Sequence, residues 1–186
     1  YLLPLSDLSN IVSQFSKIVI IAFPILISFS EVLDKVQPDI CLVHGDTTTT
    51  FSASIACLYK KIPVGHVEAG LRSFNFNEPF PEEFNRKSVS SLANIHFCPT
   101  IENSLNLLKE NVPKDKIFVT GNTVIDSLKF VLKDFKKNKD EFLKLIGEMK
   151  LILNFNFIKR KYILITGHRR ENLELGIKEI CESIKD

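Results

Sequence analysis

Residues 38–68 read PDICLVHGDTTTTFSASIACLYKKIPVGHVE, and this stretch decides the fold class. Two short apolar runs, Ile40–Val43 and Pro63–Val67, enclose a segment from Ser52 to Lys60 with a helical pattern. Apolar runs of this length predict buried strands. Strands of this kind separated by helices predict an α/β fold, with a parallel sheet that is covered by helices on both faces.

The same alternation continues beyond this stretch. Further strands are expected at Ile95–Cys98 and Ile117–Thr120, and helices at Glu82–Leu92, Glu102–Glu110 and Thr123–Lys133. In an open parallel sheet, polar residues just past the carboxyl ends of the strands form the ligand crevice. Residues at those positions are therefore the candidates for a functional site.

The pattern changes after residue 129. The stretch Lys129–Lys161 is rich in Lys, Phe, Leu and Asn, which predicts a solvated helical face or an interdomain connection. Tyr162–Thr166 then predicts a strand that runs into Gly167–Glu171 and a helix, but one strand and one helix cannot bury a core. We therefore expect one α/β domain over 1–155 and the beginning of a second one over 156–186.

Composition sets the broad class of the protein. The chain has 186 residues, of which 45% are hydrophobic and 25% charged, as in soluble globular proteins. Its net charge of +2 favours neither nucleic acid nor a membrane surface as a partner. The four cysteines form no CxxC pair, so we expect small buried residues in a reducing compartment.

The apolar run Ile18–Ile27 raises the question of a membrane segment. It holds about ten apolar residues around Pro24, whereas a bilayer span needs roughly 20. It also lacks the basic flank and cleavage site of a signal peptide. We expect a buried core helix here and, because the first residue is Tyr1, a fragment of a longer protein.

Two acids follow the first two predicted strands. Asp46, in His44-Gly45-Asp46, is either the N-cap of the next helix or a carboxylate that faces the crevice. Glu68 directly follows the second strand, where an acid is costly unless it is solvated, paired or used in chemistry. An ion pair with Arg72 and a catalytic role are the two alternatives for Glu68.

Three more segments carry candidate residues. Glu82 follows Pro81, which is ordinary chemistry for a helix start, so a functional role is the less favoured of its two interpretations. The turn Gly167–Glu171, with His168 and Arg169, fits an anion site at a helix N-terminus or a basic surface turn. Gly121-Asn122-Thr123 fits a structural turn or a sugar contact.

Together these residues favour one kind of ligand. Carboxylates opposite a His-Arg-Arg turn suit a substrate with a diphosphate and a hydroxylated ring. Such groups can move protons at carbon if burial raises a carboxylate pKa toward neutrality. The histidines are far apart in the sequence, so we expect no metal site.

The strings HGDTTTT (44–50), GHVEAGLR (65–72), TGNTVID (120–126) and TGHRREN (166–172) carry a family resemblance. In this order they resemble the non-hydrolysing UDP-N-acetylglucosamine 2-epimerases, over most of 38–126 and again from 163 to about 184. The resemblance implies two Rossmann-like domains, as in the GT-B glycosyltransferases, with the active site between them. It also implies that Asp46, Glu68, Glu82 and His168 are catalytic. Substrate contacts are expected from Arg169, Arg72 and Asn122.

The resemblance further implies a reaction and a setting. UDP-N-acetylglucosamine would be inverted at C2 to UDP-N-acetylmannosamine through a 2-acetamidoglucal intermediate, without a metal or redox cofactor. The expected setting is a cytoplasmic homodimer in polysaccharide biosynthesis, with UDP-N-acetylglucosamine also acting as an allosteric activator in some family members. Neither nucleic acid nor a membrane is an expected partner.

The chain also departs from the family pattern. The family's opening strand with its GTRPE-like turn and nearly all of its second domain have no counterpart here, and Tyr1–Val36 matches only loosely. We therefore expect the isolated chain to be inactive. The alternatives are a hydrolysing epimerase that releases UDP and N-acetylmannosamine, a non-catalytic binding or oligomerisation remnant and, from the HGD string alone, a metal-dependent phosphoesterase.

Overall fold

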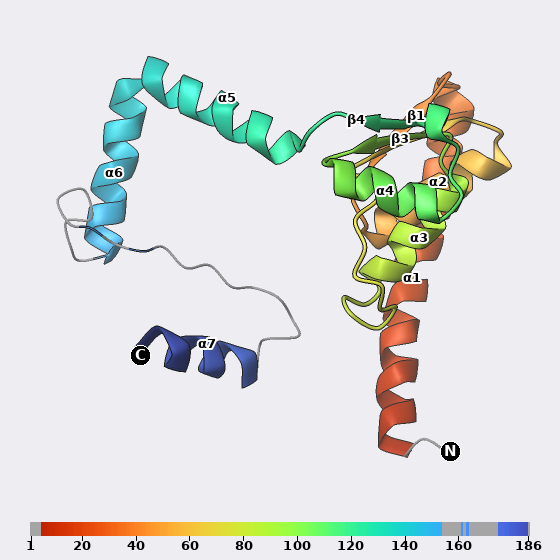
Figure 1. Ribbon diagram of the computed structural model, residues 1–186, viewed down its shortest axis with the longest axis horizontal. Helices are drawn as coiled ribbons and strands as arrows, with labels where there is room; N and C mark the ends of the chain where they lie inside the picture. Colours follow the sequence, from red (N-terminus) through yellow and green to blue (C-terminus); the bar gives the residue numbers. More distant parts are fainter. Residues whose placement is uncertain (1–4, 154–160, 162, 164–174, 186) are drawn as a thin grey trace. The chain divides into compact units, whose positions relative to one another are not determined.

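The computed structural model describes residues 5–153, 161, 163 and 175–185, and the chain divides into two units, 1–123 and 124–186. The first unit contains α1 (Leu5–Val36), β1 (Cys41–His44), α2 (Thr48–Tyr59), β2 (Val64–Val67), α3 (Glu82–Leu92), β3 (Ile95–Cys98), α4 (Ile101–Lys109), a 3-10 turn (Lys114–Lys116) and β4 (Ile117–Val119) (Figure 1). The four strands predicted from the first 123 residues are all present.

The four strands form one parallel sheet in the order β1-β2-β3-β4. Val43 is in register with His66, and His66 with His96. The α/β class and the parallel sheet are therefore confirmed. Because the strands are parallel and a helix lies between each strand and the next, their carboxyl ends meet at one edge of the sheet.

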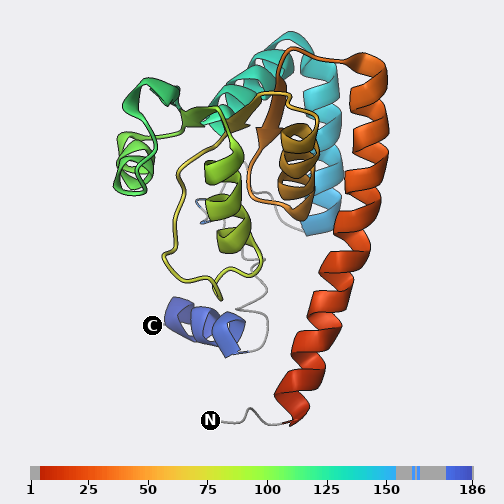
Figure 2. The ribbon, with the colours of Figure 1, turned by 90° about the vertical axis from the view of Figure 1, so that its right-hand side faces the viewer.

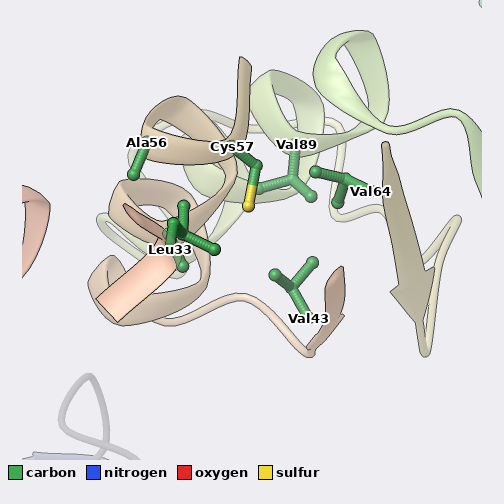
Figure 3. Close-up of a cluster of buried hydrophobic side chains, with 7 residues drawn as sticks. Leu33, Val43, Ala56, Cys57, Val64 and Val89 are labelled. Atoms are coloured by element: carbon green, nitrogen blue, oxygen red, sulfur yellow. The ribbon is translucent and has the colours of Figure 1, made fainter. Parts of the chain in front are cut away.

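The core of the first unit lies on one face of this sheet. Its buried side chains come from α1, β1, α2, β2 and α3 (Figure 3), and they are Leu33, Val43, Ala53, Ala56, Cys57, Val64 and Val89. A second cluster joins β3 to α4 through Ala69, Cys98 and Leu107. The prediction of buried cysteines is confirmed for Cys57 and Cys98, holds only in part for the half-buried Cys41, and is wrong for Cys181, which is exposed.

The opposite face of the sheet is open within the first unit. Leu42 is 62% exposed and Phe118 48%, while Val43, which points the other way, is only 6% exposed. Crossovers between parallel strands are almost always right-handed. Because β1 to β4 follow one another across the sheet in a single direction, every helix that connects two of them lies on the same face. The prediction that both faces are covered is therefore wrong for the described part of this unit.

The long helix α1 packs along one side against α2, and its N-terminal half runs out past the sheet (Figure 2). Pro24 lies inside it. Ile20 is 68% exposed, and Phe23 and Ile27 are each 59% exposed, so the prediction of a buried core helix is wrong for these side chains. None of the described helices is long and apolar enough to cross a membrane.

The second unit consists of helices in its described part. They are α5 (Thr123–Lys137), α6 (Lys139–Leu153) and α7 (Leu175–Lys185). Helices over most of 129–153 agree with the prediction of a solvated helical face, since the described side chains there are mostly exposed. The strand and turn expected at 162–171 lie outside the described residues except for Ile163, and the expected domain boundary near residue 155 stays a prediction.

Candidate functional site

The turn after β1, residues 44–46, brings Asp46 to the carboxyl edge of the sheet. Gly45 has a φ of +74°, which glycine adopts without the strain that a side chain would cause. The Gly45 amide donates to the Val67 carbonyl at 3.1 Å, so the turn stays joined to the end of β2. The N-cap of α2 is Thr47, whose hydroxyl accepts from the Thr50 amide at 3.2 Å. The alternative that Asp46 caps this helix is therefore wrong.

The side chain of Asp46 is instead held from α3. The Nε and Nη2 atoms of Arg86 lie 2.9 Å and 2.7 Å from its Oδ2. The side-chain amide of Asn85 donates to the Asp46 carbonyl at 2.8 Å. These two neighbouring residues of α3 fix both the backbone and the carboxylate of Asp46.

Glu68 follows β2 in a strained backbone conformation. Its φ is +67°, in the left-handed region that non-glycine residues seldom occupy and that costs about 1–3 kcal/mol. The next residues hold it there, because the Ala69 amide donates to the Phe97 carbonyl at 3.0 Å. Strain of this kind is typical of functional sites, where the surrounding structure imposes it.

Gly70 provides the close packing that locks this turn. It has a φ of +85°, and a Cβ at this position would lie 2.2 Å from the Asn103 carbonyl oxygen. The Gly70 carbonyl accepts from the buried side chain of Asn106 at 3.0 Å. The Glu68 turn is therefore packed directly against α4.

The Glu68 carboxylate faces the turn after β1. Its Oε2 lies 3.4 Å from His44 Nε2 and 3.5 Å from the position that a Cβ on Gly45 would take. Side chains of Glu68 and His44 are 30% and 57% exposed. The acids that follow β1 and β2 thus lie on adjoining turns and remain accessible to solvent.

Arg72 does not pair with Glu68. Its Nε and Nη2 bind the two carboxylate oxygens of Glu110 at 2.8 Å and 2.5 Å, and Nη2 also donates to Ser90 Oγ at 2.9 Å. The Arg72 side chain is 0% exposed, and its hydrogen bonds lower the pKa of the Glu110 carboxyl. The ion-pair alternative for Glu68 is therefore wrong, and a substrate contact by Arg72 stays a prediction.

The first turn of α3 carries two acids with different surroundings. Glu82, the first residue of the helix, is half-buried. Glu83 is fully buried, and its carboxylate accepts from the Ser73 and Phe74 amides at 3.0 Å and 3.1 Å and from Arg86 Nη1 at 3.2 Å. Sequence reasoning singled out Glu82 and missed Glu83 and Arg86, although the spacing of three residues was a signal that they share one helix face.

Two buried histidines lie beneath these carboxylates. His66 and His96 are in register on the neighbouring strands β2 and β3, and each is 1% exposed. Burial lowers the pKa of each imidazole to about 4. In His66, the hydrogen bond with the Gly45 carbonyl favours the charged form but does not overcome the effect of burial. Both rings are therefore neutral at neutral pH, and the cation that contacts Asp46 and Glu83 is Arg86.

The remaining predicted site residues are placed only in part. Asn122 is exposed and follows Gly121, which has a φ of +91°. His168 and Arg169 lie outside the described residues. Within the described ranges, histidines, cysteines and acids form no group of three that could hold a metal ion.

A parallel sheet with polar and acidic turns at its carboxyl edge defines the class of α/β enzymes that bind their ligands at that edge. The family model for UDP-N-acetylglucosamine 2-epimerase matches residues 7–186, so the chain belongs to this family.

Individual relatives agree with this assignment. The chain is 50% identical to the UDP-N-acetylglucosamine 2-epimerase of Neisseria meningitidis over 160 residues, which cover 86% of this chain and 42% of the relative. It is 44% identical to the enzyme of that name from Campylobacter jejuni over 176 residues, or 95% of this chain and 46% of the relative. The chain therefore spans less than half the length of these relatives.

Solved structures show the same partial match. The N. meningitidis epimerase bound to UDP-GlcNAc aligns with a TM-score of 0.80 at 48% identity, over 90% of this chain and 44% of that one. The Methanocaldococcus jannaschii epimerase in complex with UDP-GlcNAc and UDP aligns with a TM-score of 0.70 at 36% identity, over 88% and 42%.

Proposed function

We propose that this chain carries part of an active site that interconverts UDP-N-acetylglucosamine and UDP-N-acetylmannosamine. The names of its relatives and the nucleotide sugar bound in two similar structures support this substrate. The observation that supports it most within the chain is the continuous set of contacts at one edge of the sheet. These contacts join Glu68 to the turn that carries Asp46, and Asp46 to the helix that begins at Glu82.

The proposed reaction is an elimination followed by an addition. A carboxylate removes the proton from C2, the C2–H electrons form the C1–C2 double bond, and the C1–O bond breaks with its electron pair leaving on UDP. The 2-acetamidoglucal is then protonated at C2 on the other face, and a phosphate oxygen of UDP attacks C1. The net result is inversion at C2 with no change in oxidation state, so the chemistry requires no redox cofactor.

The acidic and the basic side chains act in different steps of this reaction. In this proposal Asp46, Glu68 and Glu82 handle the C2 proton and orient the sugar. His168 and Arg169 stabilise the departing diphosphate, since a guanidinium binds phosphate oxygens through its planar array of donors. Asn122 and Arg72 are proposed as further substrate contacts, and no metal ion is included.

The proposal also covers the setting of the enzyme. Because the chain spans less than half of its relatives, we propose that the 186 residues alone are inactive. The whole enzyme would be a cytoplasmic homodimer that serves polysaccharide biosynthesis, and UDP-N-acetylglucosamine would also bind it as an allosteric activator.

The test replaces the matching segment of the N. meningitidis epimerase with the complete chain. This chimera is incubated with UDP-N-acetylglucosamine in heavy water, beside the 186-residue chain alone. Active chimera should place deuterium at C2 of UDP-N-acetylmannosamine, and Asp46→Asn or Glu68→Gln should lower turnover by about 100-fold or more. The matched control is Glu102→Gln, an exposed acid on α4 that should leave turnover unchanged.

Three other results of this assay would contradict parts of the proposal. Product without deuterium at C2 excludes the proton-transfer mechanism. Free N-acetylmannosamine with UDP identifies the hydrolysing alternative. A folded chimera that converts no substrate contradicts the proposed function and favours the non-catalytic remnant.

A further inference from the structure

We propose that Arg86 is a positioning residue that fixes the carboxylate of Asp46 for catalysis, an inference that rests on the function proposed above. Its guanidinium binds two acids at once. The Nε and Nη2 atoms lie 2.9 Å and 2.7 Å from Asp46 Oδ2, and Nη1 lies 3.2 Å from Glu83 Oε2. A planar guanidinium that makes contacts on two sides cannot rotate without breaking one of them.

The burial of these groups distinguishes this set from a surface ion pair. The side chains of Arg86, Asp46 and Glu83 are 16%, 26% and 0% exposed. Exposed pairs of this kind contribute little because water competes and both side chains lose rotational freedom. Removing one partner of a buried ion pair leaves an uncompensated charge, which is strongly unfavourable, so each acid holds Arg86 in place.

Glu83 in turn is held by the main chain. Its carboxylate accepts from the Ser73 and Phe74 amides at 3.0 Å and 3.1 Å as well as from Arg86. Five residues, from Ser73 and Phe74 in the loop through Glu83 and Arg86 to Asp46, are therefore joined by consecutive contacts. Asn85 completes the arrangement by binding the Asp46 carbonyl at 2.8 Å.

The contacts are unequal at the two oxygens of Asp46. Both Arg86 contacts go to Oδ2, and in the described part of the chain no protein group donates a hydrogen bond to Oδ1. One oxygen is thus fixed, and the other is left to accept a hydrogen bond or a proton from a ligand. Because misplacing a catalytic group by about 1 Å can cost about 100-fold in rate, fixing this oxygen is the part of catalysis that we assign to Arg86.

The kinetic test uses the chimera described above. Arg86→Ala should lower kcat by about 100-fold while KM for UDP-N-acetylglucosamine changes little, since Arg86 acts through Asp46 and does not contact substrate. Added guanidinium ion should restore part of kcat in this variant, and Arg86→Lys should retain more activity than Arg86→Ala. The control is Lys87→Ala, which removes the neighbouring cation of α3, placed 4.8 Å above the Phe76 ring, and should leave kcat unchanged.

Two kinetic outcomes overturn the inference while leaving the proposed function intact. One is an Arg86→Ala variant as active as Lys87→Ala while Glu68→Gln remains inactive. The other is a loss of activity that guanidinium does not restore and that follows the fraction of unfolded protein in circular dichroism. A wild-type chimera that is folded but inactive refutes the proposed function and this inference together.

A second measurement needs no catalysis and uses the complete 186-residue chain. In its 15N NMR spectrum, the Nε–H signal of Arg86 should exchange slowly with water and should shift in Asp46→Asn but not in Lys87→Ala. A rapidly exchanging signal at the position of the exposed arginines, unchanged by Asp46→Asn, contradicts the proposed pairing. This result is obtained even if Arg86→Ala does not fold.

Discussion

Lowering the pH from about 7 to about 5 should destabilise the first unit, because His66 and His96 are buried as neutral imidazoles. Burial lowers both pKa values from 6.5 to about 4, and the nearby Arg72 acts in the same direction on both rings. His44 also opposes protonation of His66, and Lys116 that of His96. For His66, the Gly45 carbonyl and Asp46 favour the charged form, without overcoming burial.

The magnitude follows from the shift in pKa. The unfolded chain binds protons near pH 6.5 and the folded chain only near pH 4, so stability is fully present above pH 6.5 and is lost as the pH falls toward 4. Each pKa unit corresponds to about 1.4 kcal/mol, so the full effect is roughly 3 kcal/mol per histidine. By about pH 5 the loss is about 2 kcal/mol per histidine, or about 4 kcal/mol for the pair. That loss approaches the lower end of the total stability of a small domain, which is about 5–15 kcal/mol.

Urea unfolding at a series of pH values between about 7 and 5 measures this loss directly. Glu110, with a lowered carboxyl pKa, loses its stabilisation only below the ordinary value of 4.5, so it does not contribute in this range. Replacing both buried histidines (His66→Gln with His96→Gln) should flatten the dependence, while His44→Gln, with a side chain 57% exposed, should not. A free energy of unfolding that is constant across this range, or an undiminished slope in the double variant, refutes the reasoning.

Three further changes test the contacts around the site. Gly70→Ala should cost about 3 kcal/mol or more in urea unfolding, because its Cβ would meet the backbone of α4 at 2.2 Å with φ at +85°. Gly121→Ala, with a φ of +91° and no atom within 4 Å, should cost only about 1–2 kcal/mol, and equal losses would contradict the packing argument. Arg72→Ala should lower the free energy of unfolding by about 3–5 kcal/mol, since it leaves Glu110 without its buried partner, and a loss below about 1 kcal/mol would show the pair to be solvated. Thr47→Ala removes the N-cap of α2 and should cost about 1 kcal/mol, seen as a shift of a few degrees in Tm, whereas an unchanged Tm would show that the cap contributes nothing.

Much of the fold could be predicted from the sequence because its signals are local. The short apolar runs and the helices between them depend on neighbouring residues, and β1 to β4 lie where those runs lie. The open face of the sheet could not be predicted in this way. It results from the order of the strands and the shared hand of the crossovers, and the apolar side chains of a strand such as Leu42 and Val43 look alike in the sequence.

Prediction of the candidate site from the sequence has the same limit. Asp46 and Glu68 could be found because each directly follows an apolar run. Their partners could not be found, because a contact such as Asp46–Arg86 joins residues 40 positions apart that only the folded sheet and α3 bring together. For the same reason the sequence suggested Glu68 as the partner of Arg72, whereas the folded chain brings Glu110 to it.

The Glu83 carboxylate has a consequence for substitutions in its neighbourhood. One buried group supports both the main chain at Ser73 and Phe74 and the guanidinium that binds Asp46. A substitution that shifts the loop at residues 73–74 therefore also loosens Asp46, although the loop and Asp46 share no direct hydrogen bond. Random mutagenesis of this segment within the chimera should find inactivating substitutions in residues 73–80 that do not contact the proposed substrate, and they should be relieved by second-site changes in α3 rather than in the strands.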